Sequence, residues 1–324
     1  METIKFIDLF CGIGGFRQAM DEACRENNLV PDCVFSSDID LACQFSYEAN
    51  FGERPFGDIT KVDEKDIPYH DILFAGFPCQ PFSIIGQRQG FNDIRGTLFF
   101  DIARILKHKR PGAFVLENVK QLVGHDNGKT LRTIIKTLQE LDYHVQYAVL
   151  NALDYGLPQK RERVIIVGHR EPIFFSFPSP VRPFKPLSEI LEKQVDKKHY
   201  TSDYIVEKRK AKHKSAYKLS IWHENKAGNI CSYPYSCALR AGASYNYLLV
   251  NGERRLTPRE MFRLQGFPDT YKIVVNDSQA RKQAGNAVPV NIVKAVILKL
   301  LPYVASSLDI TSVLREYEVE YGTR

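Results

Sequence analysis

The 324-residue sequence lacks several features that mark other classes of protein. It has no run of about 18 apolar residues, which a membrane-spanning helix would need. Its first residues also carry no basic stretch followed by an apolar one, as a secretion signal would. Its seven cysteines are an odd number without a Cys-x-x-Cys pair, so neither a disulfide framework nor a zinc ribbon is indicated. These absences predict a soluble, cytoplasmic protein that binds neither a membrane nor a metal ion.

Charge is modest overall but unevenly distributed. The chain has 44 Lys and Arg against 38 Asp and Glu, a formal net charge of +6. Residues 184–257 hold 14 of the basic and 7 of the acidic side chains, so they carry the whole excess. The same segment contains Trp222 and seven tyrosines. Cations interleaved with flat rings are typical of surfaces that hold nucleic acid, although a solvated lysine-rich face has the same composition.

Short β-rich runs alternate with amphipathic runs up to about residue 183. Such alternation is typical of a doubly wound α/β sheet with buried central strands. The runs that predict strands are residues 4–10, 33–37, 71–75, 113–116 and 163–168. The runs that predict helices are residues 98–108 and 130–141. The proline-dense run 177–183 then breaks the pattern. We therefore expect a boundary there, followed by a smaller, irregular, β-rich domain, while an apolar helix over residues 291–308 packs back on the sheet.

A glycine-rich turn follows the first predicted strand, in the run Phe10-Cys11-Gly12-Ile13-Gly14-Gly15-Phe16. Glycines at such a turn let the backbone approach a bound nucleoside closely. The spacing is not Gly-x-Gly-x-x-Gly, which favours a nucleoside without a pyrophosphate over a dinucleotide. Asp38 ends the second strand, where a carboxylate accepts ribose hydroxyls, and Asp58 is placed to accept from an adenine amino group. A plain tight turn is the alternative interpretation.

Cys79 lies directly after the apolar run 70–76, between Pro78 and Pro81. Ligands of open α/β sheets bind just beyond the carboxyl ends of the strands, and the two prolines restrict the backbone around the thiol. This is the position of a nucleophile. A buried structural cysteine is the alternative.

Three further motifs follow along the chain. Glu117 ends the predicted strand 113–116, the run Gln159-Lys160-Arg161-Glu162-Arg163 brings cations to the start of another strand, and residues 283–289 precede the last helix. Alone, these are a surface glutamate, a solvated basic turn and a loop before a helix. In this order and together with Cys79, they indicate one family of enzymes rather than a general structural role.

The set of motifs resembles the cytosine-C5 methyltransferases of the bacterial DNA type. The similarity covers nearly the whole chain outside residues 184–257. It is carried by Phe10-Cys11-Gly12-Ile13-Gly14-Gly15, Pro78-Cys79-Gln80, Glu117-Asn118-Val119, the Gln-x-Arg-x-Arg run from Gln159, Arg255 to Glu260, Leu264 to Pro268, and Gly285-Asn286-Ala287-Val288.

The resemblance implies S-adenosylmethionine as cofactor. One departure is Ile39, where the family can place an aromatic ring against the adenine. The residues implied in cofactor binding are Phe10, Gly12, Gly14, Phe16, Asp38, Ile39, Asp58, Ile59, Pro78, Asn286 and Val288.

The implied reaction needs a covalent step, because C5 of cytosine is too poor a nucleophile to take a methyl group directly. The Cys79 thiolate adds to C6, Glu117 protonates or hydrogen-bonds N3, and Arg163 holds O2 and orients Glu117. The target must be flipped out of double-stranded DNA to be reached. Contacts with DNA are expected from Gln80, Ser83, Arg88, Arg95, Lys160, Arg161 and Arg240, and phosphate contacts from Lys208, Arg209 and Lys210.

The domains implied are a catalytic and cofactor-binding domain (residues 1–183 plus 281–324), a target-recognition domain (184–257) and a hinge (258–280). A chain of this length without regulatory extensions fits a restriction-modification or phage enzyme, and we expect the former. It would be a monomer on DNA, with a cognate endonuclease acting on the same site without a stable complex.

Two other functions are weighed against this one. A tRNA cytosine-5 methyltransferase would share the catalytic residues, but that branch carries a Cys-Phe-Thr run where this chain has Cys231-Ser232-Tyr233. A catalytically silent nucleic-acid-binding protein would not need to keep Cys79, Glu117 and Arg163 together.

Overall fold

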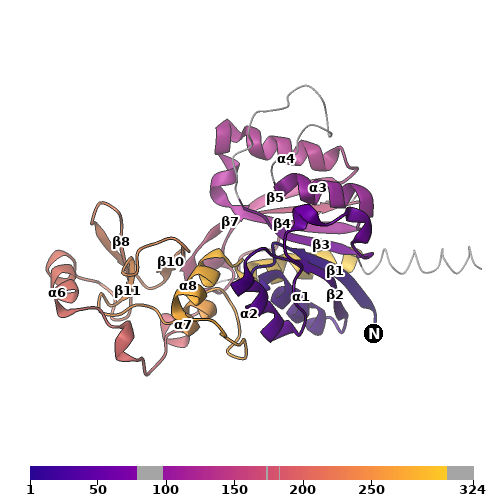
Figure 1. Ribbon diagram of the computed structural model, residues 1–324. Helices are drawn as coiled ribbons and strands as arrows, with labels where there is room; N and C mark the ends of the chain where they lie inside the picture. Colours follow the sequence, from indigo (N-terminus) through magenta and orange to yellow (C-terminus); the bar gives the residue numbers. More distant parts are fainter. Residues whose placement is uncertain (79–97, 173, 182, 305–324) are drawn as a thin grey trace, which may run out of the picture.

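The computed structural model describes residues 1–78, 98–172, 174–181 and 183–304. Its larger body contains a six-stranded sheet of order β2-β1-β3-β4-β7-β5 (Figure 1). Neighbours among β2, β1, β3 and β4 pair in parallel, whereas β7 is antiparallel to both β4 and β5. The predicted α/β class is confirmed. The strands are β1 (Thr3–Leu9), β2 (Val30–Ser37), β3 (Ile72–Gly76), β4 (Ala113–Val119), β5 (His144–Asn151) and β7 (Glu162–His169).

The sheet is covered on both faces, which explains why its central strands are continuously apolar. Successive side chains of a strand point to opposite faces, so Ile72 and Phe74 join one hydrophobic cluster and Leu73 and Ala75 join the other. Figure 1 shows α1 and α2 on one face and α3 and α4 on the other. These helices are α1 (Gly15–Glu26), α2 (Leu41–Phe51), α3 (Leu98–Lys109) and α4 (Lys129–Gln139).

The strand β5 was not predicted. It lies at the edge of the sheet, and most of its side chains are exposed or half-buried. An edge strand of this kind lacks the continuous apolar run by which the buried strands were found.

The last helical stretch packs against the body, as predicted. Asp277–Val304 is long and apolar enough to cross a membrane by length and composition, but 61% of its apolar window is buried inside the protein. It consists of α8 (Asp277–Asn286) and a helix over residues 290–304, separated by residues 287–289. Val293, Ile297 and Leu301 belong to the same hydrophobic cluster as the buried face of α1. The stretch is a core element.

A smaller lobe lies beside the sheet, with α7 and α8 between the two (Figure 1). Its centre is an antiparallel three-stranded sheet of order β11-β8-β9. One two-residue strand of this region, β10, pairs in parallel with β6, which directly precedes β7. The elements are α5 (Leu187–Ile190), α6 (Asp203–Lys212), β8 (Ile221–Glu224), β9 (Ile230–Tyr233), β10 (Ser236–Cys237), β11 (Leu248–Val250), α7 (Pro258–Leu264) and, in the body, β6 (Gln159–Lys160).

Short 3₁₀ turns complete the described secondary structure. They are η1 (Ile59–Lys61), η2 (Glu64–Asp66), η4 (Lys120–Val123), η5 (His125–Gly128), η6 (Ala152–Asp154) and η7 (Lys197–His199).

Candidate active site

A cavity of about 430 Å³ is lined by residues at the carboxyl ends of β2, β3 and β4, the start of β7, the glycine turn and residues 283–288. This is the edge at which open α/β sheets bind their ligands. The predicted residues that line it are Phe10, Gly12, Phe16, Asp38, Ile39, Asp58, Ile59, Pro78, Glu117, Arg161, Arg163, Asn286 and Val288. Segments more than 200 residues apart in the chain thus meet around one space.

The glycine turn faces the cavity through Gly12. Its φ is +55°, and a Cβ placed on it would meet no protein atom within 4 Å, so its Cα borders open space. The Gly12 N–H donates to Asp38 Oδ2 at 2.8 Å. Gly14, also expected at the cofactor, does not line the cavity: a Cβ there would lie 2.2 Å from the Phe51 ring. Gly14 is therefore required by packing and by its own φ of +77°.

Two carboxylates line the cavity in different environments. Asp38 accepts from the N–H groups of Gly12 and Asp40, and burial raises the pKa of this carboxyl in spite of those bonds. Asp58 caps η1: the Thr60 side chain and N–H donate to its Oδ1 and lower its pKa. Ile39, next to Asp38, is 73% exposed although it is apolar. A carboxylate pair and an exposed apolar side chain beside an open glycine turn fit a nucleoside.

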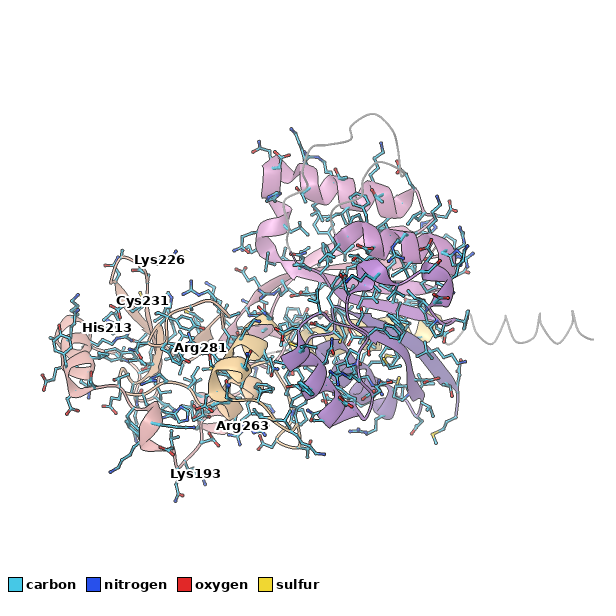
Figure 2. The ribbon with its side chains drawn as sticks, in the orientation of Figure 1. Lys193, His213, Lys226, Cys231, Arg263 and Arg281 are labelled. Carbon is cyan, nitrogen blue, oxygen red and sulfur yellow. The ribbon has the colours of Figure 1, made fainter. Side chains whose placement is uncertain are left out.

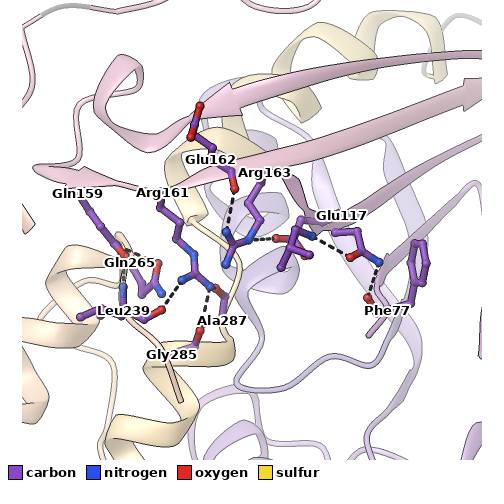
Figure 3. A network of polar contacts seen from close by, with 12 residues as sticks. Phe77, Glu117, Gln159, Arg161, Glu162, Arg163, Leu239, Gln265, Gly285 and Ala287 are labelled. Atoms are coloured by element: carbon purple, nitrogen blue, oxygen red, sulfur yellow. Dashed lines mark hydrogen bonds and ion pairs between the residues drawn. The ribbon is translucent and has the colours of Figure 1, made fainter. Parts of the chain in front are cut away.

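Glu117 and Arg163 form an ion pair in the cavity, with 2.6 Å between Oε1 and Nε (Figure 3). Strand register explains the contact, because Glu117 pairs with Ile165 of β7 and Arg163 lies two residues away, on the same face. Burial raises the pKa of Glu117, while Arg163 and Arg161 act in the opposite direction. A buried carboxyl of this kind can hold a proton and deliver it to a ring nitrogen.

A hydrogen bond of the next residue, Asn118, also helps to fix the position of Glu117. Asn118 Nδ2 donates to the carbonyl of Phe77 at 2.9 Å, which ties the end of β4 to the chain leaving β3. Pro78 follows Phe77 and is the last described residue before the gap. The predicted nucleophile Cys79, and Gln80, Ser83, Arg88 and Arg95, lie outside the described residues.

Arg161 was expected to contact DNA, and the structure contradicts this. Its side chain is 1% exposed, and its guanidinium donates to the carbonyls of Leu239, Gly285 and Ala287 at 2.8–3.0 Å (Figure 3). Burial lowers its pKa to about 9, which leaves it a cation at neutral pH. Arg161 therefore joins three chain segments together.

The sequence did hold a signal for this role. Gln159, Arg161 and Arg163 alternate along one extended run, and period-two spacing places such residues on one face. Gln159 makes the same kind of connection, because its side chain accepts from the Leu239 N–H at 2.9 Å and donates to the Leu264 carbonyl at 2.8 Å.

Charges in the smaller lobe are distributed differently from what composition suggested. Arg209, expected at a phosphate, is 3% exposed and pairs with Glu224 while donating to the Asn246 carbonyl. Trp222 is 5% exposed, so it is not available to stack on a base. Lys210 pairs with Glu253, whereas Lys208 is exposed.

Other cations of the lobe lie at its surface, among them Lys226. Figure 2 shows His213, Lys226 and Cys231 in the part of the lobe far from the large sheet, and Arg281 nearer to it. Lys160 and Arg240, both expected at DNA, are exposed.

The chain is similar to known proteins over nearly its whole length. Residues 4–301 match the family model described as C-5 cytosine-specific DNA methylase. The chain is 56% identical over 294 residues to Type II methyltransferase M.NgoBI of Neisseria gonorrhoeae, covering 90% of this chain and 91% of the relative. It is 53% identical to Type II methyltransferase M.HaeII of Haemophilus aegyptius, covering 91% and 92%. The crystal structure of a Spodoptera frugiperda DNMT2 mutant has the same fold, with a TM-score of 0.72, 21% identity and coverage of 93% and 99%.

Proposed function

The chain belongs to the C-5 cytosine-specific DNA methylase family, and on that premise we propose that the cavity holds both its methyl donor and a cytosine flipped out of double-stranded DNA. The protein is a DNA (cytosine-5-)-methyltransferase. The observation that carries the proposal is the buried Glu117–Arg163 pair, in the same cavity as the open turn at Gly12 and the carboxylate of Asp38. One end of the cavity suits a nucleoside and the other suits a polar heterocycle.

The methyl donor is S-adenosyl-L-methionine, which supplies an electrophilic methyl group when bound. Asp38 would accept hydrogen bonds from the ribose hydroxyls, and the exposed side chain of Ile39 would contact the adenine, with Asp58 near its amino group. Phe16, Asn286 and Val288 close the remaining sides. Gly12 leaves the space that such a guest requires.

Cys79 starts the reaction on the base. Its thiolate forms a bond to C6 of the cytosine, the C5–C6 double bond shifts to C4–C5, and the C4–N3 double bond opens onto N3, which takes a proton from Glu117. Arg163 keeps the Glu117 carboxyl directed at N3 and donates to O2. C5 is then nucleophilic enough to be methylated. A base next removes the proton from C5, the C6–S bond breaks, the thiolate leaves and N3 returns its proton to Glu117.

The organisation of the chain follows from this assignment. Residues 1–183 with 281–324 form the catalytic and cofactor-binding domain, residues 184–257 the target-recognition domain, and residues 258–280 the hinge. The protein acts in the cytoplasm as a monomer on DNA. It protects the sites of a cognate restriction endonuclease without a stable complex, in keeping with relatives that are Type II methyltransferases.

A duplex containing 5-fluorocytosine tests the covalent step. Fluorine at C5 cannot be removed as a proton, so the wild-type chain should form a complex with this DNA that survives denaturation and depends on S-adenosylmethionine. Cys79→Ser should form none and should lose methylation while still binding DNA. The matched control is Cys231→Ser, which replaces an exposed thiol of the smaller lobe and should trap normally. Turnover of Cys79→Ser within tenfold of wild type would refute the assignment.

A further inference from the structure

Arg240 is an exposed cation directly behind the wall of the active-site cavity. Gly285 lines that cavity, and a Cβ on Gly285 would lie 2.7 Å from the carbonyl carbon of Arg240 and 2.3 Å from the nitrogen of Ala241. The backbone at Arg240 is thus in direct contact with a cavity residue. An exposed side chain this near to the proposed cytosine site can reach the base pairs that flank a flipped cytosine.

The backbone of Arg240 is held on several sides. The preceding residue, Leu239, has its N–H bound to Gln159 and its carbonyl bound to Arg161. The N–H of Arg240 itself donates to the Tyr247 hydroxyl at 3.0 Å. Because Arg161 precedes Arg163 by two residues, these contacts fix Arg240 relative to the Glu117–Arg163 pair.

The side chain is oriented as well. Its guanidinium lies over the ring of buried Tyr247, 4.9 Å from the centroid. No carboxylate pairs with it among the residues that the structure describes, in contrast to Arg209, Arg254 and Arg263. Lys160 lies nearby, since it pairs with Cys237 of β10, three residues before Arg240. An exposed, oriented fork of donors without a protein acceptor is suited to an acceptor on the DNA.

We propose that Arg240 determines sequence specificity by binding the major-groove edge of a guanine in one of the base pairs nearest to the flipped cytosine. The inference rests on the proposed function. Guanine offers two acceptors, O6 and N7, in the geometry of a guanidinium fork, and this is the most frequent specific contact between an arginine and DNA. A phosphate is the other acceptor that an arginine meets on DNA, and contact with it carries no sequence information.

The test measures which DNA sequences are methylated, in addition to how fast they are methylated. A duplex library randomised around a central cytosine is methylated with wild type, Arg240→Lys and Arg240→Ala, and the methylated molecules are identified by bisulfite sequencing. Wild type should require guanine at one position near the cytosine. Both variants should lose that preference by about 5- to 150-fold, at that position only. Arg240→Lys keeps the charge, so it separates loss of the fork from loss of a cation. Lys226→Ala, which changes an exposed cation in the part of the lobe far from the large sheet (Figure 2), should leave the preferred sequence unchanged.

A second measurement uses the wild-type chain and so does not depend on the folding of a variant. Replacing the required guanine with 7-deazaguanine removes the N7 acceptor and should lower kcat/KM for wild type by about tenfold, with no further loss in Arg240→Lys. An unchanged preferred sequence in both variants would overturn the inference. So would an Arg240→Ala variant that weakens binding equally for all sequences and flattens the salt dependence by about one unit, because that is phosphate contact. Absence of any methylation by wild type would overturn the proposed function itself.

Discussion

The edge of the large sheet and the smaller lobe differ in how their charged residues are used. At the sheet edge, Asp38 and Glu117 lie beside the cavity, each at the end of the strand that its sequence position indicated. In the lobe, the Arg209 side chain is buried, whereas the Arg240 side chain is exposed. Both arginines belong to the same basic segment.

The difference shows which sequence features predict where a charged side chain lies in the fold. A residue at the end of a buried strand has little freedom of placement, because the strand's own burial fixes where its last side chain lies. A net charge says only how many cations a segment has. Which of them face DNA depends on the carboxylates and carbonyls that other segments bring to them.

The largest effect of a single substitution at the sheet edge is expected at Glu117. Glu117→Gln should lower kcat by about 10² to 10⁴, the loss typical of a missing general acid, with little change in cofactor affinity. Burial raises the pKa of Glu117, so the protonated acid is lost as pH rises through that raised value. The wild-type rate should therefore have a limb that falls with rising pH, and the variant should lack it.

The control for Glu117 is a neighbouring carboxylate. Glu162→Gln changes the first residue of β7, whose carboxylate pairs with Lys120. The kcat of this variant should stay close to that of wild type. A Glu117→Gln variant that lost mainly affinity for S-adenosylmethionine would place Glu117 in the cofactor site instead.

A matched pair on α6 tests the charges of the lobe. Arg209→Ala should lower the free energy of unfolding by about 2–3 kcal/mol, because it leaves Glu224 and a carbonyl without a partner. Lys208→Ala should change stability by less than about 0.5 kcal/mol. Urea unfolding of the two variants measures the difference. Equal, small effects would mean that Arg209 is solvated like its neighbour and does not stabilise the lobe.

A smaller effect is expected at the cofactor end of the cavity. Asp38→Ala should raise KM for S-adenosylmethionine about tenfold or more, with a lesser change in kcat, because hydrogen bonds to the ribose act mainly in the ground state. Asp58→Ala should have a weaker effect, since its Oδ1 is already engaged in capping η1. Initial-rate kinetics with saturating DNA separates the two constants. A drop in kcat alone for Asp38→Ala would contradict the ribose assignment.

Much of the fold was predictable from local pattern. The buried strands and the helices α3 and α4 have the expected periodicity, and their bounds differ by only a few residues from those predicted. The edge strand β5 was missed because an exposed strand does not need a continuous apolar run. Gly14 was assigned to the cofactor, but the crowding that requires it comes from Phe51, a neighbour that only the fold brings near.

Residues close together in the chain specify the α/β sheet, the glycine turn after β1 and the placement of Glu117 at a strand end, so these features could be predicted from local pattern. Contacts between distant segments make Arg161 a buried connector and leave Arg240 an exposed donor. Arg161 finds its acceptors at residues 239, 285 and 287, up to 126 positions away. The cost of burying a charge is set by such distant partners, and local sequence does not specify them.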